Sequence, residues 1–305
     1  MFVDYHIMNT FVPLVIYHVQ RTSLYFQKVI EYSSHFNHII LIGDETNATL
    51  FQHLPNVEHV PYPTLVSPDF VEFEQYFVNY STNSAWFELQ CFQRIFLLRE
   101  LMRQRGYERV FHADSDCITM VNAGDFLATY PQVQCGLVCP KQPDPFHMAC
   151  SIHNSIINTA FCDAFVQLCK DIYQNKSKFY LIEPKIRWHQ EKQLSGGICD
   201  MTLYYLIYEH KLVDGIVNLM GPILYQNDVC VFDTHMIISE GYDGEKTFQM
   251  ETEPEIKRVV QIQGAKQKCF FVSLDGKLIR TLSLHFQGLA KRFLEQYDLS
   301  DLFSP

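Results

Sequence analysis

Two aspartates separated by one residue, Asp114 and Asp116, follow a short apolar run in the segment RVFHADSDCITM at 109–120. Two carboxylates at this spacing can leave the end of a strand together and share one hard cation. Mg²⁺ and Mn²⁺ prefer oxygen ligands and are commonly completed by phosphate oxygens and water, so an ion held here could stabilise a diphosphate leaving group. An Asp-x-Asp triplet is a weak motif by itself, and a solvated acidic turn explains it equally well.

The elements before this pair are predicted to form a parallel sheet with helices on both faces. Apolar runs at 12–18 and 38–42 have the length of buried strands, and a third strand is expected at 57–60. A helical pattern at 23–34 lies between the first two, with Ser23 in the position of its N-cap. Strand, helix and strand without hydrophobic alternation are typical of a covered parallel sheet.

The clearest helix is predicted at 85–104, and Gly106 follows it as a stop signal. Its apolar residues recur at helical spacing: Trp86, Leu89, Phe92, Phe96, Leu97 and Leu101. The acidic pair therefore follows a middle strand, after at least two strand–helix units. Open α/β sheets bind their ligands at that place. No regular pattern is visible at 61–84.

The second half of the chain is predicted to alternate strands, helices and loops. We expect a strand at 134–138, a helix at 159–173 and a polar irregular stretch at 175–193. Ser195-Gly196-Gly197 then opens a helix that runs to about 210 and is followed by strand-like pieces at 212–233. A charged loop is expected at 241–254, and the segment LSLHFQGLAK at 282–291 precedes a short terminal helix.

Length and composition exclude several classes of protein. A chain of 305 residues, 48% of them hydrophobic, can bury one large core and is not generally disordered. The net charge is −10 and no basic block occurs, so no nucleic-acid partner is expected. No signal-peptide pattern is present at the start, and no apolar run reaches the roughly 20 residues of a membrane span.

Cysteines give no sign of a disulfide framework. Without a secretory signal, the ten cysteines indicate reduced thiols and a cytoplasmic location. A loose set of Cys and His at 135–153 lacks a C-x-x-C knuckle, so buried inert thiols explain it better than zinc does.

Three motifs in a fixed order give the chain a resemblance to a known family. They are Asp114-Ser115-Asp116, the segment GICDM at 197–201 that opens a helix, and HFQGLAK at 285–291, which has the spacing H-x-x-G-x-x-K. In these motifs the chain resembles GT-A glycosyltransferases, close in layout to the glycogenin and lipopolysaccharide galactosyltransferase group, over about 12–291. The resemblance implies an α/β, Rossmann-like fold with a mostly parallel central sheet, helices on both faces and a small C-terminal closing segment.

The same resemblance implies transfer of a sugar from a nucleotide-diphospho-sugar, expected to be a UDP-sugar, to a glycan or other hydroxyl acceptor. Mn²⁺, or Mg²⁺, would be held by Asp114, Asp116 and His285, since a neutral imidazole suits Mn²⁺. The alternative for His285 is a strand histidine satisfied by a hydrogen bond in the core. Lys291 would neutralise the departing diphosphate, and Gly288 would let the backbone approach it closely.

Asp200 and Arg94 are predicted to complete the reaction centre. Asp200 stands in the first turn of a helix, where the dipole keeps a carboxylate ionised, and by resemblance it works near the anomeric carbon. The group has Gln where this chain has Met201, which weakens the expectation of retention over inversion. Arg94 lies among apolar neighbours and needs an anionic partner, either the acidic pair and the phosphates or Glu88 on its own helix.

Further residues are predicted to contact the donor. From topology we expect contacts by Tyr17, His18, Asp44 and Asn83, and from the resemblance by Arg94, Asp114, Ser115, Ser151, Asn154, Gly288 and Lys291. The group has N-x-G near Ser151 and Asn154, and the glycine is missing here. Residues 10–140 would bind the nucleotide, and 141–305 the donor sugar and the acceptor. Trp188 and His189 could meet an acceptor sugar, although a buried Trp is the commoner outcome.

Two other functions remain open from the sequence. A haloacid-dehalogenase-type phosphatase also places D-x-D after an apolar strand, but Ile118 stands where that family has Thr or Val. A non-catalytic protein that binds nucleotide-sugars would account for Met201. The oligomeric state is not indicated.

Overall fold

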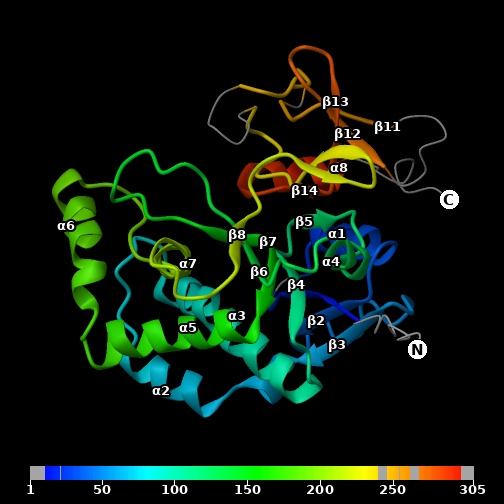
Figure 1. Ribbon diagram of the computed structural model, residues 1–305. Coiled ribbons are helices and arrows are strands. Elements are labelled where there is room, and N and C mark those ends of the chain that lie inside the picture. The colour runs from blue at the N-terminus through cyan, green and yellow to red at the C-terminus, as the bar shows by residue number, and fades with distance from the viewer. Residues whose placement is uncertain (1–10, 21, 240–245, 254, 262–267, 297–305) are drawn as a thin grey trace, which may run out of the picture.

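A seven-stranded sheet forms the centre of the computed structural model, which describes residues 11–20, 22–239, 246–253, 255–261 and 268–296. Helices cover both of its faces, and a separate five-stranded sheet stands above it in Figure 1. None of the helices within these ranges is long and apolar enough to cross a membrane.

The central sheet has the order β3-β2-β1-β4-β7-β6-β8. Its strands are β1 (Leu14–Tyr17), β2 (Ile39–Gly43), β3 (Val57–Pro61), β4 (Arg109–Ala113), β6 (Cys135–Val138), β7 (Ser151–Asn158) and β8 (Ile216–Asn218). All neighbours pair in parallel except β7, which is antiparallel to β4 and β6. The predicted α/β fold with a mostly parallel sheet is confirmed, and the run IILIG of β2 is buried throughout because both faces are covered.

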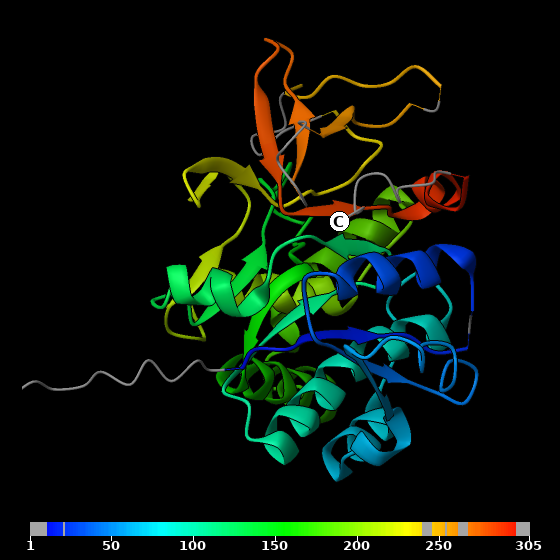
Figure 2. The same cartoon turned by 90° about the vertical axis from the view of Figure 1, so that its right-hand side faces the viewer.

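The helices separate into two layers. One face carries α1 (Leu24–Ser34), α4 (Ala123–Thr129) and α8 (Lys291–Gln296), and the other carries α2 (Pro68–Tyr76), α3 (Ala85–Arg105), α5 (Thr159–Cys169) and α7 (Asp200–Glu209), with α6 (Glu183–Lys192) farther out (Figure 1). Short turns are 3₁₀ at Tyr62–Leu65, Phe179–Leu181 and Gly288–Ala290, and π-helical at Lys170–Gln174. Figure 2 shows α8 lying along α1, so the end of the described chain packs on its beginning.

Helix α3 confirms the clearest prediction of the sequence. The hydroxyl of Ser84 accepts a hydrogen bond from the Phe87 N–H, and Gly106 ends the helix in the left-handed conformation. Two other expectations were wrong. The stretch 61–84 contains α2, whose first residue Pro68 follows the capping Ser67, and the stretch 175–193 contains α6.

Ser23 and the predicted helix at 159–173 differ in detail from expectation. Ser23 occupies the N-cap position of α1, but its side chain makes no capping hydrogen bond. The α-helix that begins at Thr159 ends at Cys169, and a π turn continues it.

The second sheet has the order β11-β12-β13-β10-β9. It consists of β9 (Ile223–Tyr225), β10 (Asp228–Val231), β11 (Val259–Gln261), β12 (Cys269–Val272) and β13 (Leu278–Thr281). The expected charged loop at 241–254 lies partly outside the described residues, and its described part pairs Met250 with Lys257 in an isolated bridge. The predicted division at residue 140 into two functional halves stays a prediction.

A two-stranded ribbon joins the end of the chain to the acidic pair. Strand β5 (Cys117–Thr119) pairs antiparallel with β14 (Ser283–His285), and the register places His285 opposite Cys117. The Phe286 N–H donates to the carbonyl of Asp116 over 2.8 Å. Both strands are buried, and this burial stabilises the ribbon. The ribbon places the motif that begins at His285 next to Asp114 and Asp116.

Candidate active site

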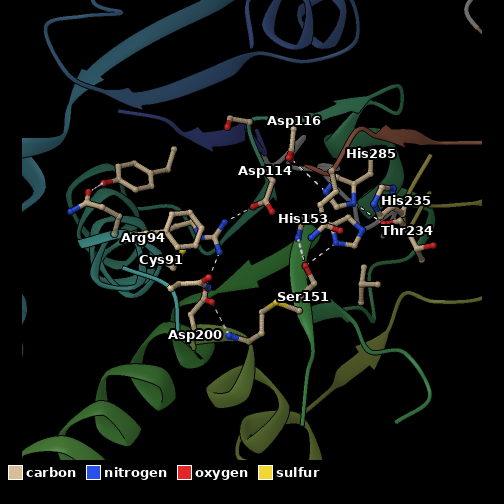
Figure 3. Close-up of a pocket in the computed structure, with 18 of the residues that line it drawn as sticks. Cys91, Arg94, Asp114, Asp116, Ser151, His153, Asp200, Thr234, His235 and His285 are labelled. Atoms are coloured by element: carbon tan, nitrogen blue, oxygen red, sulfur yellow. Dashed lines mark hydrogen bonds and ion pairs between the residues drawn. The ribbon is translucent and has the colours of Figure 1, made fainter. Parts of the chain in front are cut away.

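A cavity of about 1100 Å³ opens at the carboxyl ends of β1 and β4. Tyr17 and His18 reach it from the end of β1, and Asp114, Ser115 and Asp116 from the end of β4. This is the edge at which an open α/β sheet binds ligands, and it is where the sequence placed the acidic pair. Figure 3 shows the side chains that converge on it.

Asp114, Asp116 and His285 form the one group of three potential metal ligands found among the described residues. One ligand atom from each lies within 4.8 Å of the others. His285 Nδ1 lies 2.7 Å from the carbonyl oxygen of Thr234, which can only accept, so Nδ1 carries the proton. In the neutral ring, Nε2 then carries the lone pair and faces Asp116 Oδ1 at 3.4 Å (Figure 3). This is the orientation that a metal-binding histidine takes.

The electrostatics of this group favour a bound cation. Burial lowers the pKa of His285, but Asp116 and Asp114 outweigh it, so the pKa lies above its ordinary value. Burial raises the pKa of Asp116, but His285 and Lys291 lower it by more. The pKa of Asp116 therefore lies well below its usual range. The site therefore attracts positive charge, and two carboxylates with one imidazole nitrogen fit Mn²⁺ or Mg²⁺.

Lys291 reaches the same carboxylate from the start of α8. Its Nζ lies 2.9 Å from Asp116 Oδ2, and about a third of its side chain is exposed to solvent. It also lies over the ring of Tyr25. An ammonium at the cavity wall can turn from the carboxylate to an incoming anion, because its four-carbon stem is flexible.

Arg94 links the acidic pair to Asp200. One guanidinium nitrogen donates to Asp114 Oδ1 and another to Asp200 Oδ2, the second over 2.7 Å (Figure 3). Asp200 also accepts from the hydroxyl of Tyr204 at 2.9 Å. Of the two partners expected for Arg94, the acidic pair is therefore the one found, and Glu88 instead accepts from the Asn83 amide.

Most of the predicted donor contacts line the cavity. Those on its wall are Tyr17, His18, Asn83, Arg94, Asp114, Ser115, Ser151, Asp200 and Lys291. The hydroxyl of Tyr17 donates to Gln90 Oε1 over 2.5 Å, and His18 Nδ1 lies 2.9 Å from the hydroxyl of Ser115.

Three predicted contacts are not on this wall. Asp44 accepts from the backbone N–H groups of Gln20 and Thr46 and so closes the turn after β2. Asn154 is fully buried and donates to Ser283 Oγ over 3.0 Å, which ties β7 to β14. Gly288 has φ +60°, a conformation suited to glycine, and begins the 3₁₀ turn that leads into α8. The geometry gives these three structural roles, and their contacts to a donor stay predictions.

Several residues at the site carried no signal in the sequence. The ring of His153 stacks on that of His285 with centroids 4.1 Å apart, and burial lowers the pKa of His153 to about 3, so this ring is neutral. Thr234 contributes only a backbone carbonyl. Neither a single histidine of β7 nor a main-chain oxygen belongs to a motif. His153 drew attention only as a member of the loose Cys and His set at 135–153, which gives no indication of a contact with His285.

A buried ion pair supports His285 from behind. Lys257 Nζ lies 2.5 Å from Asp233 Oδ1, and both side chains are shielded from solvent. The other oxygen of Asp233 accepts from the backbone N–H of His285 over 2.9 Å. The ion pair therefore fixes the main chain of β14 at His285, the residue whose imidazole faces Asp116.

The aromatic residues expected near an acceptor differ from those at the cavity. Trp188 and His189 are not among the lining residues, and the Trp188 ring stacks on Phe146 with centroids 5.7 Å apart. Trp86, which the helical pattern placed on the core face of α3, instead lines the cavity and is about half exposed.

No protein-family model matches this chain, and no curated protein matches it. Among solved structures, mouse xyloside xylosyltransferase 1 in its apo form is similar, with 13% identity and a TM-score of 0.41 over 68% of this chain and 84% of the other. A glycosyltransferase involved in the glycosylation of the major capsid of PBCV-1 is similar at 8% identity and a TM-score of 0.35, over 93% and 97% of the two chains. Both are glycosyltransferases, whereas the narrower resemblance to the glycogenin group is not confirmed. At these identities and TM-scores, the likeness does not establish the activity of this chain.

Proposed function

We propose that this protein is a metal-dependent glycosyltransferase that moves a sugar from a nucleotide-diphospho-sugar, a UDP-sugar in our expectation, to a hydroxyl acceptor. One observation carries the proposal: Asp114 and Asp116 meet His285 at the wall of a large cavity, beside the ammonium of Lys291. Two acids, an imidazole and a lysine are the groups needed to hold a cation and a diphosphate together.

The donor set suits Mn²⁺ somewhat better than Mg²⁺, because Mg²⁺ favours oxygen ligands alone and Mn²⁺ accepts imidazole. When bound, the ion would act as a Lewis acid that takes up the charge of the departing diphosphate. Lys291 would add its own charge on the leaving-group side. Its contact with Asp116 keeps the ammonium at the cavity wall.

Arg94 is proposed to hold the two carboxylates in a fixed arrangement. Its bonds to Asp114 and Asp200 neutralise part of their charge and prevent either side chain from rotating. Asp200, held by hydrogen bonds from Arg94 and Tyr204, would stabilise positive charge at the anomeric carbon or accept a hydrogen bond from the acceptor hydroxyl. Retention of configuration remains the expected outcome, with Met201 in place of the Gln of the resembling group.

The groups around the acidic pair favour the transferase over the phosphatase alternative. A phosphatase would use an oxygen of Asp114 as its nucleophile. Arg94 binds only Oδ1 of Asp114, while His285 and Lys291 lie beside Asp116. An imidazole and an ammonium next to the second acid suit a cation and a diphosphate.

The proposal is tested by the dependence of donor binding on Mn²⁺. Uridine diphosphate with Mn²⁺ should raise the midpoint of thermal unfolding of the native protein, because a ligand that binds only the folded state stabilises it. Asp116→Asn should abolish the rise, and Asp214→Asn, at an exposed turn outside the cavity, should retain it. Release of sugar from a panel of UDP-sugars without acceptor should follow the same pattern. Full activity of Asp116→Asn in the presence of a chelator would contradict the proposal.

A further inference from the structure

Two aromatic side chains stand half exposed at the wall of the cavity. Trp86 is 47% and Phe87 50% accessible to solvent, and both belong to the first turn of α3. Large rings are usually buried, because removing their apolar surface from water stabilises the folded chain. Adjacent exposed rings that face a cavity are therefore more informative than scattered surface hydrophobics.

Helix geometry fixes how far these rings lie from the reaction centre. Trp86, Gln90 and Arg94 follow each other at intervals of four residues, so they lie along one stripe of α3. Eight residues of helix span about 12 Å, from the Trp86 backbone to that of Arg94. Trp86 therefore lines one part of the cavity, and the Arg94–Asp200 contact lies at the other end of the stripe. Phe87 lines the cavity from the same turn of α3 as Trp86.

The cavity is as large as the largest sites for a small molecule. Its volume is about 1100 Å³, against roughly 300–1,000 Å³ for a typical ligand pocket. Polar groups lie beside the rings. Gln90 Oε1 is occupied by the Tyr17 hydroxyl, which leaves its amide nitrogen to donate, and the Asn83 amide donates to Glu88, which leaves its oxygen to accept.

We infer that Trp86 and Phe87 form an acceptor subsite for a saccharide, an inference that rests on the proposed function for the identity of the reaction. A sugar presents an apolar face of C–H groups and a rim of hydroxyls, which match flat rings bordered by amide groups. An acyl chain would need a continuous apolar groove, whereas the lining of this cavity also includes the amides of Asn83 and Gln90. The acceptor hydroxyl then belongs to a carbohydrate.

Tryptophan fluorescence can test this directly, because the chain has two Trp residues. Trp188→Phe keeps an aromatic ring against Phe146 and leaves Trp86 as the single reporter. This variant is titrated, in uridine diphosphate and Mn²⁺, with methyl glycosides of glucose, galactose, mannose and xylose, and with lactose, maltose, cellobiose and xylobiose. We expect a saturable change of Trp86 emission with at least one of these sugars.

Further variants sharpen the result. Phe87→Ala in the same background should weaken that saccharide about two- to tenfold, the usual value of one aromatic contact. Tyr180→Ala, at a ring that is 64% exposed and does not line the cavity, should leave the affinity unchanged.

The possible outcomes separate this inference from the proposed function. If uridine diphosphate with Mn²⁺ still raises the unfolding temperature and no saccharide alters Trp86 emission, the subsite inference is wrong and the proposed function stands. If saccharides bind and the nucleotide does not, the subsite stands and the transferase proposal fails. A response to phosphatidylcholine vesicles but to no sugar would overturn the inference in favour of a lipid acceptor.

Discussion

His285 lies between two carboxylates, those of Asp233 and Asp116, which have different roles. Behind it, Asp233 has its oxygens occupied by Lys257, by the His285 main chain and by the His235 N–H, and its side chain is completely shielded. In front of it, Asp116 borders an open cavity with Asp114. A carboxylate enclosed on all sides holds a structure together, whereas one at a cavity wall can exchange part of its contacts for a cation.

The difference also concerns the two sheets. The central sheet supplies the acids from the end of β4, and the segments around the second sheet supply Asp233 and Lys257. Asp114, Asp116 and His285 form an open cluster, and the proposed function depends on its ability to accept a cation. Asp233 and Lys257 form a closed cluster, which fixes the position of His285. Three substitutions would separate these roles, beyond the tests of Asp116 and Trp86 given above.

The largest effect is expected from breaking the closed cluster. Lys257→Met leaves Asp233 as an unpaired buried charge, which typically costs about 3–5 kcal/mol of unfolding free energy. Chemical denaturation measures the loss. The matched control is Lys268→Met, which removes an ion pair to Asp228 with about 30% of each side chain exposed and should cost less than about 1 kcal/mol. Equal losses in the two variants would mean that the buried pair is not special.

A smaller effect on stability and a large one on metal binding are expected from the open cluster. His285→Asn removes the imidazole ligand and should weaken Mn²⁺ at least about tenfold, or ~1.4 kcal/mol, with a smaller loss for Mg²⁺. Isothermal titration with each ion gives the two affinities. His210→Asn, on the exposed end of α7, should change neither. An unchanged ratio of Mn²⁺ to Mg²⁺ affinity would remove His285 from the ligand set.

The smallest effect concerns Glu88, which is buried near Asp200. Burial raises its pKa, and hydrogen bonds from Asn83 and Ser81 reverse this only in part. For an acid with a raised pKa, the folded state holds the proton more tightly than the unfolded chain. Its contribution to stability is therefore full below the unfolded pKa of about 4.3 and declines as pH rises through the folded pKa.

Glu88→Gln should remove this decline and slightly raise the unfolding free energy at pH 7 relative to pH 4. Denaturation curves at the two values of pH measure the difference. Glu209→Gln, at an exposed position of α7, is the control for a change of net charge. A stability profile of Glu88→Gln identical to that of the native protein would show that the burial of this carboxyl has no energetic consequence.

The sequence predicted the first half of the fold well because its strands are continuous apolar runs and α3 has a long helical period. It missed α2 and α6, whose apolar residues are few and interrupted by polar or aromatic neighbours. Of the second sheet, only β9 and β10 fall within the predicted strand-like pieces at 212–233. Strands β11, β12 and β13 were not predicted, because they have three or four residues each and are too short for a pattern.

Within the site, the acids and His285 were predicted because they belong to spaced motifs. Asp233 and Lys257 could not be, because a buried ion pair between residues 24 positions apart has no local signature. For Trp86, the sequence predicted the wrong environment. Helical spacing assigned it to the core, yet at the first turn of α3 the same face borders the cavity.

The pairing of β5 with β14 determines when, during synthesis, Asp114, Asp116 and His285 can come together. During synthesis the acids of the first motif emerge more than 160 residues before the histidine that β14 brings to them. Domains generally fold as units during synthesis. Because Leu284 of β14 shares a buried core with residues of α1 and β5, the three candidate ligands come together only after the last strand has left the ribosome.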